Sequence, residues 1–182
     1  MKANPKDEWM KFKISLQSVL TGLKPDERMR LKKYGDRKYF FNELVLPKVA
    51  HDLTYILKPE FLRVDYTLMK LGECEFNVPM VCIESENNFD SCYEEILKLS
   101  SINAPLKILI AYGMPDDRLK DYTDNDIIDI YIFEDFLSIT QLVGWYAVLV
   151  YDDTEPVPKF HVYVYNEKGE RVTEECKHMQ FG

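Results

Sequence analysis

The spacing of apolar residues predicts two helices in the first third of the chain. Residues 8–23 carry apolar groups at helical spacing and end at glycine and proline residues, which is typical of an N-terminal helix. A second helix is predicted over Lys38–Leu57, where Pro47 should kink it or delay its start and Pro59 should end it. Its broad apolar face consists of Phe41, Leu44, Val45, Val49, Leu53 and Ile56.

Two predicted strands carry acidic residues at defined positions. Phe61–Leu68 alternates between apolar and polar residues, so Asp65 is expected on the face opposite the apolar row. Met80–Glu86 starts as a buried strand and becomes polar at its C-terminal end. Because side chains alternate along a strand, Glu84 and Glu86 should project from the same face.

The rest of the chain predicts another helix and further strands. Ser91–Ile102 opens with the Ser-x-x-Glu spacing of a capping box and is predicted to be a helix. The nearly continuous apolar run Pro105–Tyr112 predicts a central strand, covered on both faces and parallel to the strand before the helix. Trp145–Tyr151 and the alternating segment Phe160–Tyr165 predict two C-terminal strands, and a turn leads on to Arg171–Thr173.

These elements predict an α/β fold that borders on α+β. We expect a central mixed sheet flanked by helices, with extra antiparallel strands at the C-terminus. The length suits a single domain over residues 1–182. We divide it into a helical extension at 1–37, a core at 38–112, and a helix with C-terminal strands at 113–182. The helix of the last part is placed over residues 115–135, whose many acids are typical of a solvated helix face.

Composition narrows the class of protein. Apolar residues make up 46% and charged residues 30% of the chain, which is the balance of a folded globular protein. No apolar run approaches the roughly 20 residues that span a bilayer, and Met1–Lys13 is too polar for a signal peptide, so we expect a cytoplasmic protein with no membrane partner. The four cysteines form no Cys-x-x-Cys pair and are expected to be reduced, and the three histidines are too far apart in sequence to suggest a zinc site.

A formal net charge of −8 argues against a protein that coats nucleic acid, because such binding relies on Lys and Arg neutralising phosphates. Residues 28–38 are a local exception. They hold six basic side chains, namely Arg28, Arg30, Lys32, Lys33, Arg37 and Lys38. The plainer interpretation of this stretch is a solvated helix face and loop.

Three carboxylates form the candidate site, Asp65 on one strand and Glu84 and Glu86 on the next. If the two strands pair, their oxygens converge and can hold Mg²⁺, which prefers a few carboxylates together with water and substrate phosphate. A metal there would lower the pKa of its bound water and neutralise charge on a phosphoryl group, as phosphodiester hydrolysis requires. In the plainer interpretation, Glu84 and Glu86 lie at a solvated strand end and pair with Arg63 or Lys70.

The order helix, strand with Asp65, strand with Glu84, helix, strand resembles the core of the PD-(D/E)xK, or restriction-endonuclease-like, superfamily. The resemblance spans residues 38–112. Within it, Asp65 and Glu84 match the two motif acids, and Glu43 in the preceding helix resembles an extra acid that many members carry.

The lysine of the family's motif is missing from the second strand, because Glu86 stands in its place. Some members are described as carrying this lysine on the following helix, and Lys98 is the candidate for that position. Lys98 is also four positions after Glu94, the spacing of a plain surface pair on a helix.

Two interpretations of the function remain open. The resemblance implies a Mg²⁺-dependent nuclease that acts on nucleic acid, and it requires basic groups from residues 28–38 or Lys70 beside the acids. The residues it assigns are Asp65, Glu84, Glu86 and Lys98 for catalysis, and Asp65, Glu84, Glu86 and Glu43 as metal ligands. The alternative is a catalytically inactive member of the same fold that acts as a protein-interaction or regulatory module. No Walker or GxGxxG sequence supports nucleotide binding, and the sequence does not distinguish a monomer from a homodimer.

Overall fold

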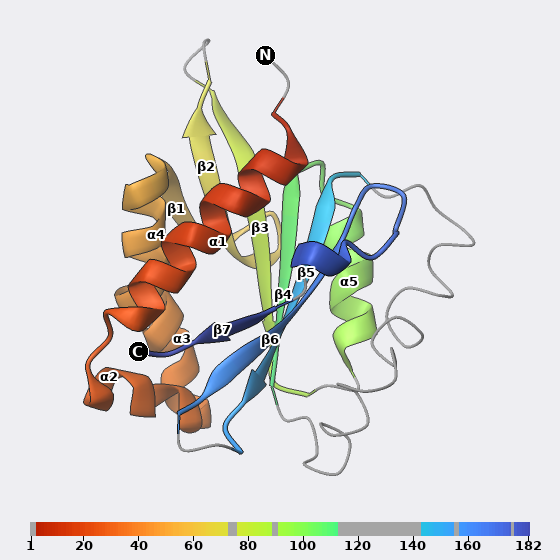
Figure 1. Cartoon of the computed structure of the whole chain (residues 1–182). Coiled ribbons are helices and arrows are strands. Elements are labelled where there is room, and N and C mark those ends of the chain that lie inside the picture. Colours follow the sequence, from red (N-terminus) through yellow and green to blue (C-terminus); the bar gives the residue numbers. More distant parts are fainter. Residues whose placement is uncertain (1–2, 73–75, 89–90, 113–142, 155–156, 176) are drawn as a thin grey trace.

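The structure, a computed structural model, is built on one mixed sheet whose seven strands lie in chain order (Figure 1). It describes residues 3–72, 76–88, 91–112, 143–154, 157–175 and 177–182. The strands are β1 (Ile56–Phe61), β2 (Val64–Leu71), β3 (Asn77–Glu86), β4 (Leu106–Ala111), β5 (Trp145–Asp152), β6 (Lys159–Tyr165) and β7 (His178–Gln180). Strands β3, β4 and β5 are mutually parallel, and every other neighbouring pair is antiparallel. The predicted α/β fold with a mixed sheet is confirmed.

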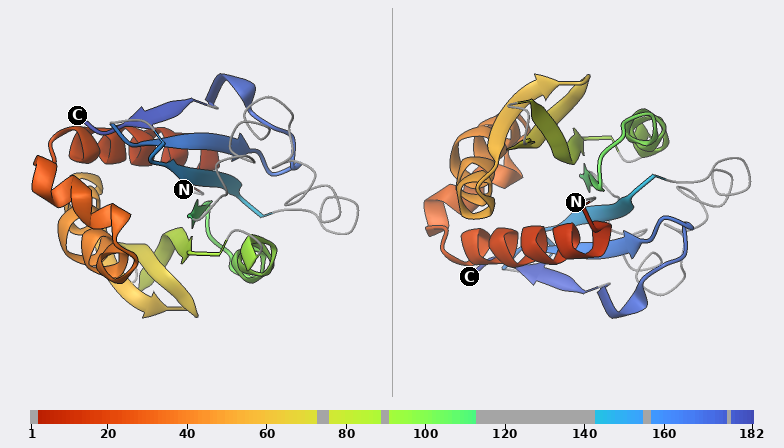
Figure 2. Two further views of the ribbon diagram at one scale, coloured as in Figure 1. Left: turned by 90° about the horizontal axis from the view of Figure 1, so that it is seen from below. Right: turned by 90° about the horizontal axis from the view of Figure 1, so that it is seen from above.

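Helices lie on both faces of this sheet (Figure 2). The α-helices are α1 (Pro5–Thr21), α2 (Pro25–Met29), α3 (Arg37–Tyr39), α4 (Leu46–Leu53) and α5 (Cys92–Ser100). Short 3₁₀ turns are formed by Arg30–Lys32, Tyr34–Asp36 and Thr173–Glu175, and Phe40–Val45 is a π-helix. Helices α1 and α4 cover one face, and α5 covers the other.

Each face of the sheet has its own apolar core. On the first face, Trp9, Phe12 and Leu16 of α1 recur at helical spacing and are at most 1% exposed. On the second face, Ile96 and Leu99 of α5 pack with residues of β3 to β6. Burying a side chain of this size contributes about 1.5–3 kcal/mol. Every residue of β4 is buried, as the predicted central strand requires.

The predicted helix over Lys38–Leu57 is shorter and less regular than expected. Pro47 has no N–H to donate, and the residues before it wind as a π-helix before α4 begins at Leu46. Thr54 then ends α4 in the left-handed conformation, with a φ of 58°. The last part of the predicted helix is strand β1, an edge strand in which a proline is tolerated.

The predicted strand Phe61–Leu68 contains a turn. Phe61 ends β1 and pairs with Val64, the first residue of β2, so Leu62 and Arg63 form a two-residue hairpin loop. Alternation of apolar residues continues across this loop, which is why the sequence pattern resembles one unbroken strand. Asp65 is therefore the second residue of β2 and lies beside the turn.

The C-terminal part was predicted in outline. Strands β5 and β6 are confirmed, but β5 is parallel to β4 and only β6 and β7 add antiparallel pairs. The segment expected at residues 171–173 makes a single bridge, Tyr165 to Arg171, and the outer strand is β7 instead. The helix predicted over residues 115–135 lies outside the described residues. In the part of the chain that the structure describes, no helix combines the length and the apolar character needed to cross a membrane.

Candidate functional site

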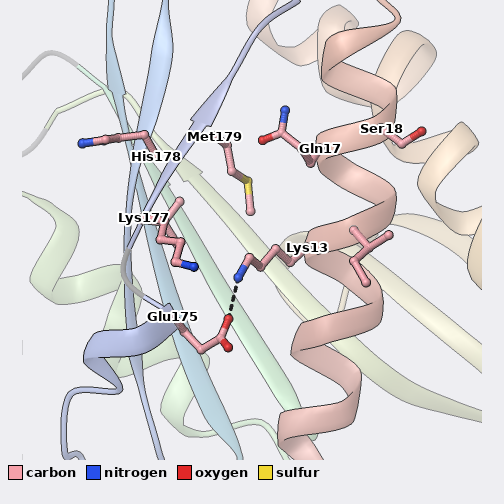
Figure 3. Close-up of a pocket in the computed structure, with 9 residues that line it drawn as sticks. Lys13, Gln17, Ser18, Glu175, Lys177, His178 and Met179 are labelled. Atoms are coloured by element: carbon pink, nitrogen blue, oxygen red, sulfur yellow. Dashed lines mark hydrogen bonds and ion pairs between the residues drawn. The ribbon is translucent and has the colours of Figure 1, made fainter.

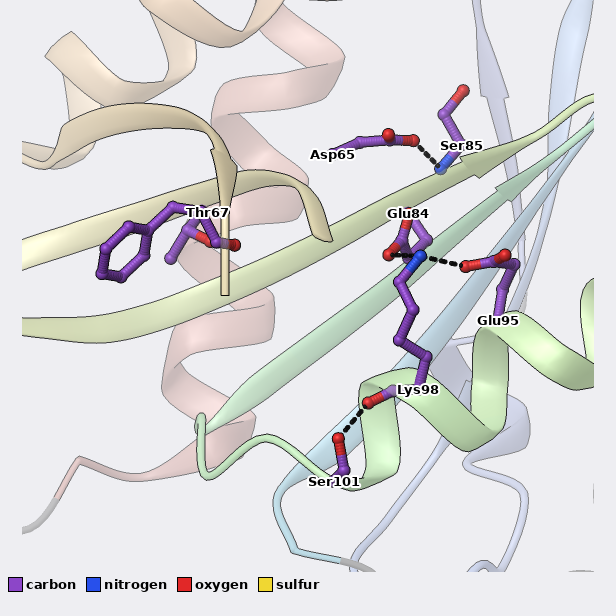
Figure 4. Close-up of polar contacts among 8 residues, drawn as sticks. Asp65, Thr67, Glu84, Ser85, Glu95, Lys98 and Ser101 are labelled. Carbon is purple, nitrogen blue, oxygen red and sulfur yellow. Dashed lines mark hydrogen bonds and ion pairs between the residues drawn. The ribbon is translucent and has the colours of Figure 1, made fainter. Parts of the chain in front are cut away.

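Asp65 and Glu84 occupy neighbouring strands, and Figure 4 shows Asp65 directed at Ser85 and Glu84 directed at Lys98 of α5. Strands β2 and β3 are antiparallel, and Tyr66 pairs with Ile83, so Asp65 and Glu84 are cross-strand neighbours. Asp65 Oδ2 accepts a hydrogen bond from the backbone N–H of Ser85 at 2.9 Å. The pairing of these two strands was the condition on which the predicted site depended, and the structure brings their first two acids together.

Lys98 completes this group from the opposite side. Its Nζ lies 2.5 Å from Glu84 Oε1 and 2.7 Å from Glu95 Oε2 (Figure 4). Cys92, Ile96 and Leu99 bury one stripe of α5 against the sheet, and Lys98 lies at the border of that stripe with 35% of its side chain exposed. The pairing partner expected from the sequence was Glu94, but the structure pairs Lys98 with Glu95 one position later.

Burial shapes the charge of this cluster. Glu84 is only 2% exposed, and its desolvation raises the pKa of the carboxyl to about 8, with the negative charges of Asp65 and Glu95 acting in the same direction and Lys98 opposing them. Burial alone would lower the pKa of Lys98, but its hydrogen bonds to Glu84 and Glu95 raise it above the usual value. Lys98 therefore stays cationic, whereas Glu84 takes up a proton near neutral pH.

The other two predicted metal ligands are not part of this group. Glu86 ends β3 half-buried, and its Oε1 accepts a hydrogen bond from the backbone N–H of Asn88 at 2.6 Å. Glu43 lies exposed on the π-helix, and no described hydrogen bond or ion pair joins it to Asp65 or Glu84. Among the described residues, no three side chains of His, Cys, Asp or Glu gather as metal ligands. The donors present are the carboxylates of Asp65 and Glu84, a pair that suits Mg²⁺ when water and substrate phosphate supply the remaining oxygens.

Basic residues border the acidic pair. Lys38 of α3 lies 2.5 Å from Glu60 of β1, and the charge of Asp65 helps to raise the pKa of Lys38. Arg37 donates from Nη1 to Asn87 Oδ1 at 2.5 Å, immediately after the end of β3. The last two residues of the basic stretch 28–38, Arg37 and Lys38, thus lie near the acidic strand end.

The alternative partners of the acids are absent from the site. Lys70 pairs in register with Val78, towards the far end of β2 from Asp65. Arg63 lies exposed in the hairpin loop. Glu60, Glu95 and Asn87 are unpredicted partners of the cations. The spacing of three between Glu95 and Lys98 was a signal for one of these pairs.

A separate pocket of about 390 Å³ lies between α1 and the C-terminal segment (Figure 3). Glu175 at its edge accepts hydrogen bonds from Lys13 Nζ at 2.6 Å and Trp9 Nε1 at 3.0 Å. Neither Asp65 nor Glu84 lines it. The contact of Lys13 with Glu175 and the hydrogen bond from Gln17 Nε2 to the carbonyl of Gln180 link α1 to the C-terminal segment.

Two of the three histidines also meet, although their sequence separation gave no sign of it. The rings of His161 and His178 pack edge to face, with centroids 4.6 Å apart, because β6 and β7 pair at these residues. Nε2 of His161 lies 2.8 Å from Asp152 Oδ2, a buried polar contact at the end of β5.

Comparisons of the chain with known protein families, with curated proteins and with solved structures found no match.

Proposed function

We propose that this protein is a divergent metal-dependent nuclease of the PD-(D/E)xK type, in which Lys98 of α5 replaces the lysine that the strand motif lacks. The observation that carries the proposal is the 2.5 Å contact between Lys98 Nζ and Glu84, whose cross-strand neighbour is Asp65. Glu86 stands where the family's motif has a lysine and cannot supply a cation. Lys98 of the helix places a cation next to Glu84 instead.

The order of elements supports the same proposal. Helix α4 is followed by β1, β2 with Asp65, β3 with Glu84, α5 and β4. Strand β4 is parallel to β3, so the connection through α5 is a crossover. It returns the chain to the end of the sheet at which β3 began. Apart from the additional strand β1, this is the order of helix, acidic strands, helix and strand on which the resemblance was based.

Each residue has a defined role in this proposal. Asp65 and Glu84 would hold Mg²⁺, which, when bound, supplies a water of lowered pKa and neutralises charge on the phosphoryl group. Lys98, already cationic and next to Glu84, would stabilise the negative charge that develops on the phosphate oxygens. Glu84 must give up its proton when a cation binds, because its pKa is raised to about 8.

One observation favours the alternative, an inactive interaction module. Lys98 lies 2.5 Å from Glu84 without any metal, so the pair also makes sense as a structural contact between α5 and the sheet. The two functions differ in whether a divalent cation binds and whether a phosphodiester is then cleaved.

Calorimetric titration of Mn²⁺ and Mg²⁺ tests the proposal. We expect the wild type to bind the cation, and the double variant Asp65→Ala plus Glu84→Ala to lose binding. Single- and double-stranded DNA and RNA are then offered as substrates. Lys98→Met should retain the cation and lose cleavage, whereas Lys70→Met, an exposed lysine at the other end of β2, should cleave like the wild type. Absence of cation binding by the wild type would remove the nuclease proposal and leave the interaction module.

A further inference from the structure

Basic side chains and two tyrosines share the exposed and half-buried positions of residues 30–39, which form two 3₁₀ turns and α3. We call this the basic–aromatic surface, and its members are Arg30, Lys32, Lys33, Tyr34, Arg37, Lys38 and Tyr39. Tyr34 is 72% and Tyr39 is 46% exposed. Asp36 is the one acid within this stretch, in a chain whose net charge is −8. The surface is therefore a local inversion of the charge of the whole protein.

The local structure explains why these side chains remain on the surface. Leu31 is fully buried and anchors the first turn, so its neighbours Arg30 and Lys32 point outwards. The guanidinium of Arg30 lies 4.7 Å from the ring centre of Tyr39, and that of Arg37 lies 5.9 Å from the ring centre of Tyr34. Each tyrosine thus presents a ring beside a cation, the combination that stacks on nucleic-acid bases.

Neighbouring acids neutralise two of the cations in part. Lys38 pairs with Glu60 at 2.5 Å, and Lys32 lies 4.0 Å from Asp153, in each case between exposed side chains. Pairs of this kind at the surface contribute little to stability, so a phosphate can replace the carboxylate as partner. Lys33 and Arg30 add further positive charge to the same surface.

The surface adjoins the candidate site. Arg37 binds Asn87, the residue after Glu86, and its guanidinium stacks 4.1 Å from the ring centre of Tyr112, the residue after β4. Lys38 lies near enough to Asp65 for that charge to raise the pKa of the lysine. A chain of phosphates bound along the surface would therefore lead to Asp65 and Glu84.

We propose that the basic–aromatic surface binds single-stranded nucleic acid and that Tyr34 and Tyr39 stack on its unpaired bases. Cations bind the phosphates of any nucleic acid, but base faces are accessible to a tyrosine ring only where they are not stacked in a duplex. The delivery of the strand to Asp65, Glu84 and Lys98 rests on the proposed nuclease function. The binding itself does not.

Fluorescence anisotropy with labelled strands of about 16 nucleotides, long enough to cover a single-strand site, tests the binding. The probes are an oligothymidylate, an oligouridylate and a duplex of the same length, and EDTA is present so that cleavage cannot contribute. We expect either single strand to bind roughly tenfold more tightly than the duplex, because stacking is worth about 1–3 kcal/mol per base.

Two variants and two matched controls locate the binding site. Tyr34→Ala with Tyr39→Ala should weaken single-strand binding by roughly tenfold or more and leave duplex binding almost unchanged. Lys32→Glu with Lys33→Glu should weaken the binding of both and flatten its dependence on salt. Phe76→Ala removes an aromatic ring that is 76% exposed elsewhere, and Lys48→Glu with Lys168→Glu makes the same charge change at other exposed positions. Both controls should bind like the wild type. The lysine variant and both controls retain Tyr34 and Tyr39.

Several outcomes would overturn this inference. They are equal binding of duplex and single strand, equal losses in the control variants, or binding to phosphatidylserine vesicles without binding to either single strand. Adding Mn²⁺ separates the inference from the proposed function. Strand binding without cleavage retains the inference and overturns the nuclease. Cleavage of the small diester bis(p-nitrophenyl) phosphate without strand binding overturns the inference alone.

Discussion

Lys98 Nζ of α5 lies 2.5 Å from Glu84 Oε1 of β3, although Glu84 is almost completely buried and Lys98 is one-third exposed. The pair crosses the interface between the helix and the sheet. Glu84 is also the cross-strand neighbour of Asp65. The pair of Lys98 and Glu84 is therefore either the centre of an active site or a contact that holds α5 in place. These two roles predict different responses to substitution.

Replacing Lys98 by Met should destabilise the fold in a manner that depends on pH. Without the ammonium, an ionised Glu84 would be buried beside the charges of Asp65 and Glu95, which costs about 1–3 kcal/mol. At pH 5 the carboxyl is protonated, because its pKa is raised to about 8, and the loss should be much smaller. Urea denaturation at pH 5 and pH 8.5 measures the difference.

Glu95→Gln is the control for this experiment, since it removes the other partner of Lys98 and leaves the ion pair with Glu84 intact. It should change stability by less than about 0.5 kcal/mol at either pH. Equal losses for Lys98→Met at both pH values would show that the raised pKa of Glu84 plays no part in stability.

Cation binding should strengthen as the pH rises towards 8. A metal ligand must be deprotonated, and Glu84 carries a proton at pH values below its raised pKa of about 8. Below that value, the dissociation constant of Mn²⁺ should increase by up to about tenfold for each unit of pH. Calorimetry in two buffers that differ in ionisation enthalpy should detect up to one proton released per cation bound. Glu84→Gln should abolish the proton release, and an affinity independent of pH between 6 and 8 would exclude Glu84 as a ligand.

The sequence predicted the acidic strands and offered Lys98 as a candidate, but it did not predict the contacts that Lys98 makes. Asp65 and Glu84 followed from period-two alternation, which the strand pairing of β2 and β3 preserved. The position of Lys98 depends on how α5 rotates about its axis, which is fixed by the packing of Ile96 and Leu99 against the sheet. Strand β1 was missed because its stability comes from pairing with β2, and Pro59 suggested a helix end. Such long-range contacts leave no local pattern.

The hairpin loop before Asp65 stores backbone strain that substitution should release. Leu62 and Arg63 have φ values of 59° and 63°, the left-handed conformation that a two-residue type I′ turn requires at both positions. Asn and Gly adopt it far more readily, and the strain of an unsuitable residue is about 1–3 kcal/mol. Leu62→Asn with Arg63→Gly should therefore raise the free energy of unfolding by roughly 1–2 kcal/mol.

Thermal and urea denaturation measure this gain. Leu71→Asn is the matched control, because Leu71 is exposed at the other end of β2 and does not have a positive φ. It should give no stabilisation. If the double variant is no more stable than the wild type, contacts of the Leu62 or Arg63 side chains must offset the backbone strain.

Acid should weaken the junction of β5 and β6 through Asp152. This carboxylate is 5% exposed, and desolvation tends to raise its pKa, but hydrogen bonds from Thr154 and the contact with His161 outweigh burial and lower the pKa to about 2. A carboxyl whose pKa is lower in the folded state stabilises the fold above the pKa of the unfolded chain, and this contribution is lost as the pH falls towards the folded value. The contribution should therefore be complete above about pH 4 and fade between pH 4 and pH 2, with a size of about 2 kcal/mol from the shift of the pKa.

Asp152→Asn should accordingly lower the free energy of unfolding near pH 6 and approach the wild type at pH 2. Asp153→Asn, at an exposed neighbouring position, is the control and should change the free energy of unfolding by less than about 0.5 kcal/mol throughout. Denaturation by urea across this range measures both variants, and a loss in Asp152→Asn that persists undiminished at pH 2 would mean that packing, and not the charge of Asp152, holds the junction together.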